Sequence, residues 1–180
     1  MLFGLKIVIL PPISTYLYFK AMKRLFFVVL LISFISSAFA QLPSVSLKDI
    51  NGNSVNTAEL NNDGKPFIID FFATWCKPCN RELDAIAEVY DEWREETGVK
   101  IIAVSIDVAQ NVNKVKPLVD NHGWEYDVLL DDDGEFKRAM NVQSVPHSFL
   151  LDKEGRIIYN HVGYTDGDEA EVEKKLKVDS

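Results

Sequence analysis

Cysteine is scarce in this sequence, whose 180 residues include only Cys76 and Cys79. Two cysteines are too few for the disulfide framework that stabilises small secreted domains with little core. Basic residues are scarce as well, with 19 Lys and Arg against 27 Asp and Glu and a formal net charge of −8. Because a basic surface is needed to neutralise phosphate groups, this composition argues against nucleic acid as a partner.

A membrane-spanning run is missing too. The main apolar run, residues 25–39, is interrupted by serines and falls short of the about 20 apolar residues that cross a membrane. It follows the basic pair Lys23-Arg24 and ends in Ala38-Phe39-Ala40, which is the three-part pattern of a secretory signal. We therefore predict a leader over residues 1–40 that starts at Met22 and is cleaved after Ala40. The expected compartment is the periplasm, and a membrane-tethered or extracellular protein is the alternative.

Residues 41–180 are predicted to form one α/β domain with a net charge of −12, from 15 basic and 27 acidic residues. Buried strands are expected at residues 67–72 and 101–106. The helix over residues 76–97 is expected to bury a face formed by Leu83, Ile86, Ala87 and Tyr90. The other expected elements are a hairpin near residues 45–55, a helix over 112–121, a strand at 127–130, a short helix ending near 140, a strand pair at 148–151 and 157–160, and a final helix over 168–176.

Cys76 and Cys79 follow the first of these strands and open the helix. Their spacing places both sulfurs on one helix face, within reach of a disulfide. The unpaired amides at a helix N-terminus stabilise a thiolate, so Cys76 is expected to be the attacking sulfur. Lys77 adds positive charge beside it, and Pro78 fits the first helical turn. Cys79 lies one turn further in, so it should be more buried and resolve the mixed disulfide.

Three other roles fit the cysteine pair less well. A structural disulfide here would close a loop of only about four residues and constrain the unfolded chain little. A zinc site would need two further ligands, and the three histidines show no close paired spacing. Haem attachment needs a histidine directly after the second cysteine, where this chain has Asn80. We therefore expect a redox-active pair that needs neither a metal nor another cofactor.

Asp70 and Glu82 are the candidate proton-transfer groups. Asp70 interrupts an apolar strand, so we expect it to be buried, with a pKa raised by desolvation. It can then take the proton of Cys79 when the mixed disulfide resolves, and its alternative role is to cap the strand or bind a buried water. Glu82 follows Cys79 by three residues on the same helix face. Its alternative role is that of a solvated helix residue.

Four blocks of the sequence resemble the thioredoxin superfamily, and more closely its exported TlpA/ResA-like, redoxin-type thiol-disulfide oxidoreductases. They are FFATWCKPCNRE, IIAVSID, VLLDDDGEFKRAMNV and SVPHSFLLDKEGRII, in this order. The resemblance implies a thioredoxin-like fold, with a central mixed β-sheet flanked by helices, an N-terminal hairpin and a central insertion. It also implies a cis peptide bond at Val145-Pro146 facing the cysteines, although most X-Pro bonds are trans. The expected substrate-binding residues are Trp75, Pro78, Val145 and Pro146.

Two positions depart from the pattern of the ResA-like branch. Asp70 stands where ResA-like members commonly have asparagine and thioredoxins have aspartate, whereas Glu82 matches the ResA-like branch. His147 stands directly after the loop proline, where threonine is often found. An imidazole there can tune the thiols or bind copper, and the alternative is a packing or surface histidine.

The leading hypothesis is an exported reductase of protein disulfides that acts through a dithiol/disulfide cycle. The resemblance implies protein thiol or disulfide clients and a membrane electron donor, with cytochrome c maturation or general envelope redox homeostasis as the pathway. One alternative is a non-catalytic copper- or partner-binding module of the same fold. The other is a redoxin-type peroxidase. The threonine motif of the peroxide pocket, with its upstream proline, is absent, although Thr74 lies two residues before Cys76.

Overall fold

The computed structural model describes residues 42–179, so the predicted leader over residues 1–40 lies outside the described residues. The elements follow one another in the expected order, from the N-terminal hairpin to the final helix. Over residues 42–179, no helix combines the length and the apolar character needed to span a membrane.

The described part of the chain forms seven strands, namely β1 (Ser46–Asp49), β2 (Ser54–Asn56), β3 (Phe67–Phe72), β4 (Lys100–Ser105), β5 (Asp127–Leu130), β6 (His147–Leu151) and β7 (Ile157–Val162). They make one sheet in the order β2-β1-β5-β4-β3-β6-β7. The neighbours β3, β4 and β5 run parallel, and every other neighbouring pair is antiparallel. The sheet is therefore mixed, as the resemblance implies.

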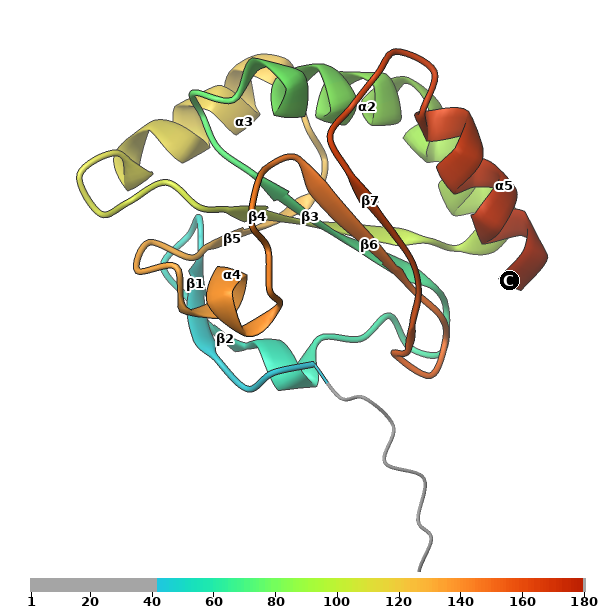
Figure 1. Cartoon of the computed structure of the whole chain (residues 1–180), viewed down its shortest axis with the longest axis horizontal. Helices are drawn as coiled ribbons and strands as arrows, with labels where there is room; N and C mark the ends of the chain where they lie inside the picture. Colours follow the sequence, from blue (N-terminus) through green and yellow to red (C-terminus); the bar gives the residue numbers. More distant parts are fainter. Residues whose placement is uncertain (1–41, 180) are drawn as a thin grey trace, which may run out of the picture. The chain divides into compact units, whose positions relative to one another are not determined.

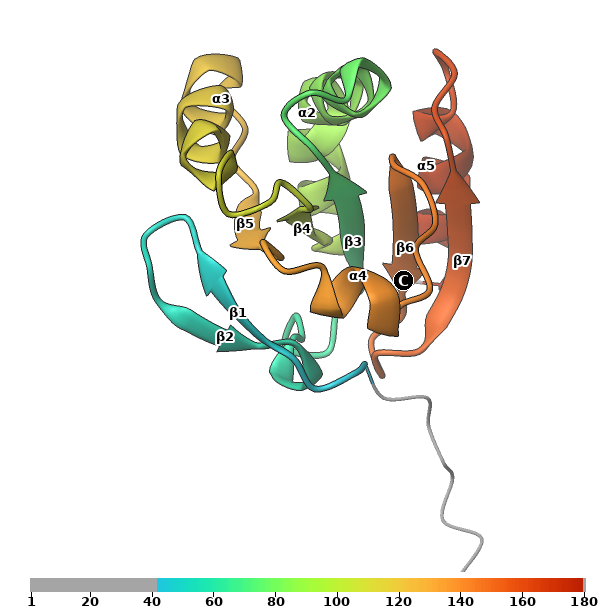
Figure 2. The same cartoon turned by 60° about the vertical axis from the view of Figure 1, so that its left-hand side comes forward.

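Helices cover both faces of this sheet (Figure 1, Figure 2). One face carries α2 (Lys77–Thr97), α3 (Val115–His122) and α5 (Glu169–Asp179), and the other carries the short α4 (Glu135–Ala139). A 3-10 turn, η1 (Thr57–Glu59), follows the hairpin of β1 and β2. The segment after β4 forms a second turn, η2 (Val112–Lys114), then α3 and β5, and it corresponds to the expected central insertion. The predicted thioredoxin-like architecture is confirmed.

Strand β3 is buried on both faces, so its residues alternate between two core clusters. The odd-numbered residues pack on the side of α4. The even-numbered Ile68 and Phe72 pack on the side of α2 and α3, in the cluster that also contains both cysteines. Asp70 shares the alternation of Ile68 and Phe72 and therefore faces the layer of α2.

Helix α2 buries one stripe against the sheet, made of Cys79, Glu82, Leu83, Ile86, Tyr90 and Trp93. Ala87 is exposed, so its predicted burial is wrong. Cys79, Leu83, Ile86, Tyr90 and Trp93 advance by three or four residues at each step, Glu82 widens the stripe on one side, and Ala87 lies just beyond its other side. The helix ends at Gly98, where a φ of 70° favours glycine and the amide donates to the Arg94 carbonyl oxygen at 3.0 Å.

Candidate active site at the start of helix α2

The two cysteines lie where β3 ends and α2 begins. Cys76 is the N-cap of α2, and its Sγ accepts a hydrogen bond from the Cys79 amide, with 3.3 Å between sulfur and nitrogen. The pair forms a disulfide with 5.3 Å between the two Cα atoms. Cys76 is 5% exposed and Cys79 is fully buried, which is the expected order of burial. The helix start thus supplies an amide to the outer sulfur, an arrangement that favours its thiolate form.

Asp107, a buried residue with no predicted role, holds the turn before Cys76. One of its carboxylate oxygens accepts hydrogen bonds from the Thr74 amide at 2.7 Å and the Ser105 hydroxyl at 2.9 Å. The other oxygen accepts a hydrogen bond from the Thr74 hydroxyl at 2.7 Å. The one sequence signal for this role is an aspartate just after a buried strand. These bonds fix the turn and commit the Thr74 hydroxyl to Asp107.

Asp70 is fully buried in the layer between the sheet and α2. Among residues 42–179, neither of its carboxyl oxygens has a hydrogen-bond partner. Burial raises its pKa well above the usual range, and the nearby Glu82 carboxyl raises it further. The predicted burial is therefore confirmed, and the pKa of Asp70 shifts in the predicted direction.

Glu82 is also buried, and it is tied to the sheet by Ser148. Ser148 on β6 is the cross-strand neighbour of Asp70 on β3, so its side chain faces α2 as that of Asp70 does. The Ser148 hydroxyl donates a hydrogen bond to Glu82 Oε1 at 2.7 Å. Burial raises the pKa of Glu82 to about 7, the Ser148 hydrogen bond acts in the opposite direction, and the charges of Asp168 and Glu169 raise it. A carboxyl group that titrates near neutral pH can both accept and release a proton during turnover. No sequence pattern pointed to Ser148.

The predicted substrate-binding residues meet at the same end of the sheet. Trp75 is 65% exposed, and Lys77 and Pro78 are exposed in the first turn of α2. The Val145-Pro146 peptide bond is cis, as the resemblance implies. Val145 packs against the core cluster that contains both cysteines. Val145 packs against the other core cluster as well, and the pairing of His147 with Phe71 places the proline loop beside the end of β3 from which the cysteine turn leads.

His147 faces the other side of the sheet. Residues alternate along β6, so Ser148 faces α2 and His147 faces the side of α4. Its ring stacks on Phe149 with 4.3 Å between the ring centroids, and Phe149 belongs to the core cluster on the α4 side. Burial lowers the pKa of His147, and the neighbouring His161 lowers it further. This position supports a packing role and offers no geometric support for copper binding or thiol tuning.

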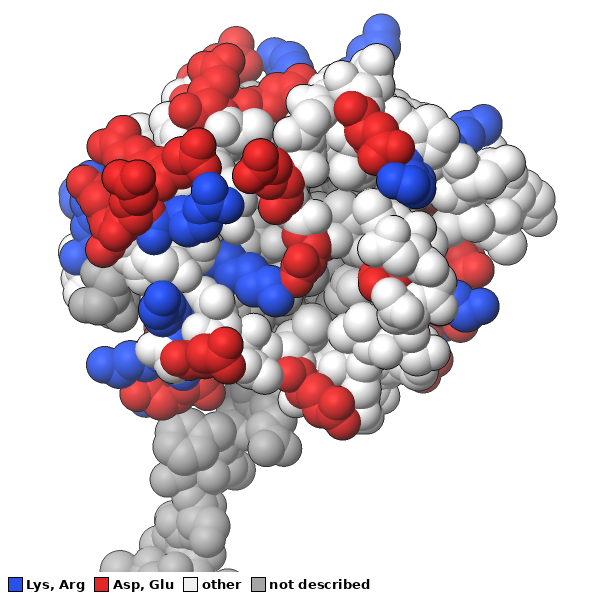
Figure 3. All heavy atoms as spheres, turned by 180° about the vertical axis from the view of Figure 1, so that it is seen from behind, with Lys and Arg blue, Asp and Glu red and all other residues white. Residues whose placement is uncertain are grey.

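Charged side chains gather on the side of the molecule that carries α5 (Figure 3). Within the described residues, one set of three carboxylates lies close enough together to share a metal ion, namely those of Glu92, Glu96 and Glu173. Lys177 pairs with Glu96 at 2.9 Å and with Glu173 at 2.6 Å. A surface ion-pair network accounts for this cluster.

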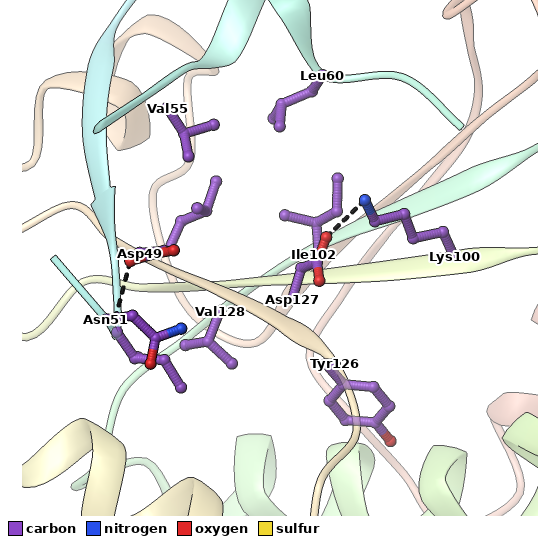
Figure 4. A pocket seen from close by; sticks show the side chains of 11 residues that line it. Asp49, Asn51, Val55, Leu60, Lys100, Ile102, Tyr126, Asp127 and Val128 are labelled. Atoms are coloured by element: carbon purple, nitrogen blue, oxygen red, sulfur yellow. Dashed lines mark hydrogen bonds and ion pairs between the residues drawn. The ribbon is translucent and has the colours of Figure 1, made fainter. Parts of the chain in front are cut away.

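A cavity of about 340 Å³ lies beside the hairpin, where β4 and β5 begin (Figure 4). Val55 and Leu60 line it from one side, and Lys100 and Asp127 line it from the strands. The Lys100 ammonium lies 2.5 Å from the Asp127 carboxylate, so these two charges are already paired. Its lining includes no residue of the cysteine turn, which separates it from the thiol chemistry.

The fold and the placement of the disulfide define a thiol-disulfide oxidoreductase of the thioredoxin superfamily. Residues 39–160 match the AhpC/TSA family, and the chain belongs to this redoxin-type family.

Curated relatives agree with this class. The chain is 31% identical to the thiol-disulfide oxidoreductase ResA of Bacillus thuringiensis over 123 residues, which is 68% of each protein. It is 32% identical to the thioredoxin-like protein YneN of Bacillus subtilis over 140 residues, covering 77% of this chain and 78% of YneN.

Solved structures agree as well. The solution structure of a thioredoxin-like protein from Porphyromonas gingivalis aligns with a TM-score of 0.71 and 62% sequence identity. The alignment covers 78% of this chain and 92% of the Porphyromonas gingivalis chain. StoA from Bacillus subtilis has 25% identity and a TM-score of 0.58, covering 75% of this chain and 98% of its own. The predicted fold and enzyme class are thus confirmed.

Proposed function

We propose that this enzyme is an exported reductase of protein disulfides, with Cys76 as the nucleophile and Cys79 as the resolving thiol. The observation that carries the assignment is the asymmetry of the pair. Cys76 caps α2 and receives an amide hydrogen bond, whereas Cys79 is fully buried one turn further in. The outer sulfur is the one that a client disulfide can reach.

The reaction begins with both cysteines reduced. The Cys76 thiolate attacks one sulfur of the client disulfide, the client S–S bond breaks, and the other client sulfur leaves as a thiolate that takes up a proton. Cys79 then gives its proton to the Glu82 carboxylate and attacks Cys76 Sγ, which breaks the mixed disulfide and expels the second client sulfur as a thiolate that takes up a proton. The client leaves with two thiols and the enzyme keeps the Cys76–Cys79 disulfide, so two electrons have passed to the client.

The two buried carboxyls have different roles in this scheme. Glu82, with a pKa of about 7, is ionised often enough at neutral pH to accept the Cys79 proton. Burial and the Glu82 charge raise the pKa of Asp70 well above its usual range, which disfavours a second negative charge in the site. Lys77, exposed next to Cys76, supports the thiolate by its charge.

Each turnover leaves the enzyme oxidised, so the cycle needs a reductant. An exported protein works in an oxidising compartment, and we therefore assign the return of two electrons to a membrane redox partner. Disulfides of exported proteins are the clients, and cytochrome c maturation or general envelope redox homeostasis is the pathway that such a reductase serves. The relatives named as thiol-disulfide oxidoreductases support the exchange chemistry.

The peroxidase alternative finds less support in the site. A peroxidase of this type would use a threonine hydroxyl to bind peroxide beside the attacking thiolate. The hydroxyl of Thr74 instead donates to Asp107 at 2.7 Å. Hydrogen peroxide should therefore oxidise the reduced enzyme no faster than it oxidises a model dithiol.

The deciding experiment measures the reduction potential of the pair against glutathione, together with the reduction of insulin disulfides. We expect a potential well below that of strong oxidants such as DsbA, and insulin reduction that Cys76→Ser abolishes. A potential at the oxidising end would refute the reductase assignment. N-terminal sequencing of the exported protein tests the leader, and a mature chain that begins before Gln41 would contradict cleavage after Ala40.

A further inference from the structure

An open groove of about 620 Å³ starts beside the cysteine turn and runs along the central insertion. It is lined by Trp75, the residue before Cys76, and by residues of the insertion that include Lys114 of η2 and Leu118 of α3. The groove is thus built from two segments that lie about 40 residues apart in the sequence. Its position next to Cys76 means that a client bound to this sulfur must place its neighbouring residues in or near the groove.

The lining suits a peptide chain. Trp75 is 65% exposed and, with Pro117 and Leu118, offers apolar contact. The side chains of Asn111 and Asn121 also line the groove, and neither makes a hydrogen bond within residues 42–179. Amide side chains with free donors and acceptors can bind the backbone of an extended segment.

The charge of the groove is opposite to that of the domain. Lys114 is its one charged lining residue, and Lys77 stands beside Cys76 at the same end. Neither lysine is in an ion pair within the described residues, whereas Lys116 on the same insertion pairs with Asp120 at 3.0 Å. In a chain with a net charge of −8, Lys114 is an unpaired positive charge in the groove, and Lys77 is a second one directly after Cys76 in the sequence.

We propose that this groove binds the segment of a client protein that flanks its reactive cysteine, and that it selects clients with an acidic side chain in that segment. This inference rests on the proposed function, because it names the clients of the same cysteine pair. Trp75 and Leu118 hold the segment, the asparagines bind its backbone, and Lys114 pairs with the acid. Charge complementarity of this kind raises the rate of encounter and discriminates among clients.

The test compares two synthetic disulfide peptides that are identical except for Asp or Lys beside one cysteine. We expect the reduced protein to reduce the Asp peptide faster at low salt, by up to about fivefold, which is the effect of a single exposed ion pair, and we expect salt to weaken this preference. Lys114→Glu should reverse the preference towards the Lys peptide, a gain that a misfolded protein cannot produce. The matched control Lys116→Glu changes the net charge equally, lies outside the groove and should keep the original preference.

Equal rates for the two peptides, or an unchanged preference in Lys114→Glu, would overturn the inference. A reversal in Lys116→Glu as well would also overturn it, because net charge alone would then explain the selection. Reduction of hydroxyethyl disulfide, a small neutral substrate, separates these failures from failure of the proposed function. If the wild-type protein reduces this compound without preferring either peptide, the groove assignment alone is wrong. If the protein reduces no disulfide at all, the reductase assignment is wrong.

Discussion

Replacing Glu82 with glutamine tests the electrostatics of the buried site directly. Burial raises the pKa of Glu82 from 4.5 to about 7, so the folded protein binds this proton more tightly than the unfolded chain does. Ionisation of Glu82 therefore does not reduce the free energy of unfolding below pH 4.5. It reduces this free energy progressively between pH 4.5 and 7, and by the full amount above pH 7. Each pKa unit corresponds to about 1.36 kcal/mol, so the full reduction is about 3 kcal/mol.

Glutamine cannot ionise, so the Glu82→Gln variant escapes this reduction. We expect the free energy of unfolding of the oxidised variant to match that of the wild type near pH 4. Near pH 8 it should exceed the wild-type value by up to about 3 kcal/mol. Urea unfolding followed by circular dichroism between pH 4 and 9 measures this difference. The matched control is Glu88→Gln, an exposed glutamate on the same helix, which should show no comparable rise. A Glu82→Gln difference that stays constant over this range would refute the reasoning.

The other predictions concern the residues around the cysteine pair. Ser148→Ala removes the hydrogen bond that lowers the pKa of Glu82, so this pKa should rise above about 7. The pH profile of kcat/KM for thiol exchange should then move to higher pH, and an unchanged profile would contradict the assigned contact. Cys79→Ser leaves Cys76 without its internal partner, so mixed disulfides with client peptides should accumulate on non-reducing gels, and rapid release of the client would show that Cys79 does not resolve them. Asp107→Ala removes the three hydrogen bonds that this carboxylate accepts near the turn, so it should lower the free energy of unfolding by about 2 to 4 kcal/mol. Asp107→Asn should lower it less. A loss under about 1 kcal/mol in the alanine variant would argue against the anchoring role.

Local patterns in the sequence were sufficient to predict the elements and the reactive pair. The strand at residues 127–130 lies where the pattern placed it, and α2 begins at the predicted cysteine turn. Apolar periodicity and the position of Cys76 and Cys79 depend on neighbours within one or two turns of the chain. Such information is present in the sequence before any tertiary contact is known.

The missed residues depend on contacts between distant parts of the chain. The hydrogen bond from Ser148 to Glu82 joins positions 66 residues apart, and the bonds from Thr74 to Asp107 join positions 33 apart. Strand register decides these contacts, since it sets Ser148 opposite Asp70 and directs His147 to the other face. No local spacing in the sequence encodes that register. The hydrogen bond from Ser148 to Glu82 and those from Thr74 to Asp107 are therefore visible only in the folded structure.

The short loop closed by the Cys76–Cys79 disulfide also bears on the durability of the enzyme. Closing a loop of four residues restricts the unfolded chain by roughly 2 kcal/mol in a simple entropy model, against nearly 5 kcal/mol for a loop of 100 residues. Opening this bond therefore removes less of the constraint on the unfolded chain than opening a long-range disulfide would. Because the packed core between the sheet and α2 does not depend on this small constraint, we expect the reduced protein to stay folded, so that the same molecule can be reduced and reoxidised many times.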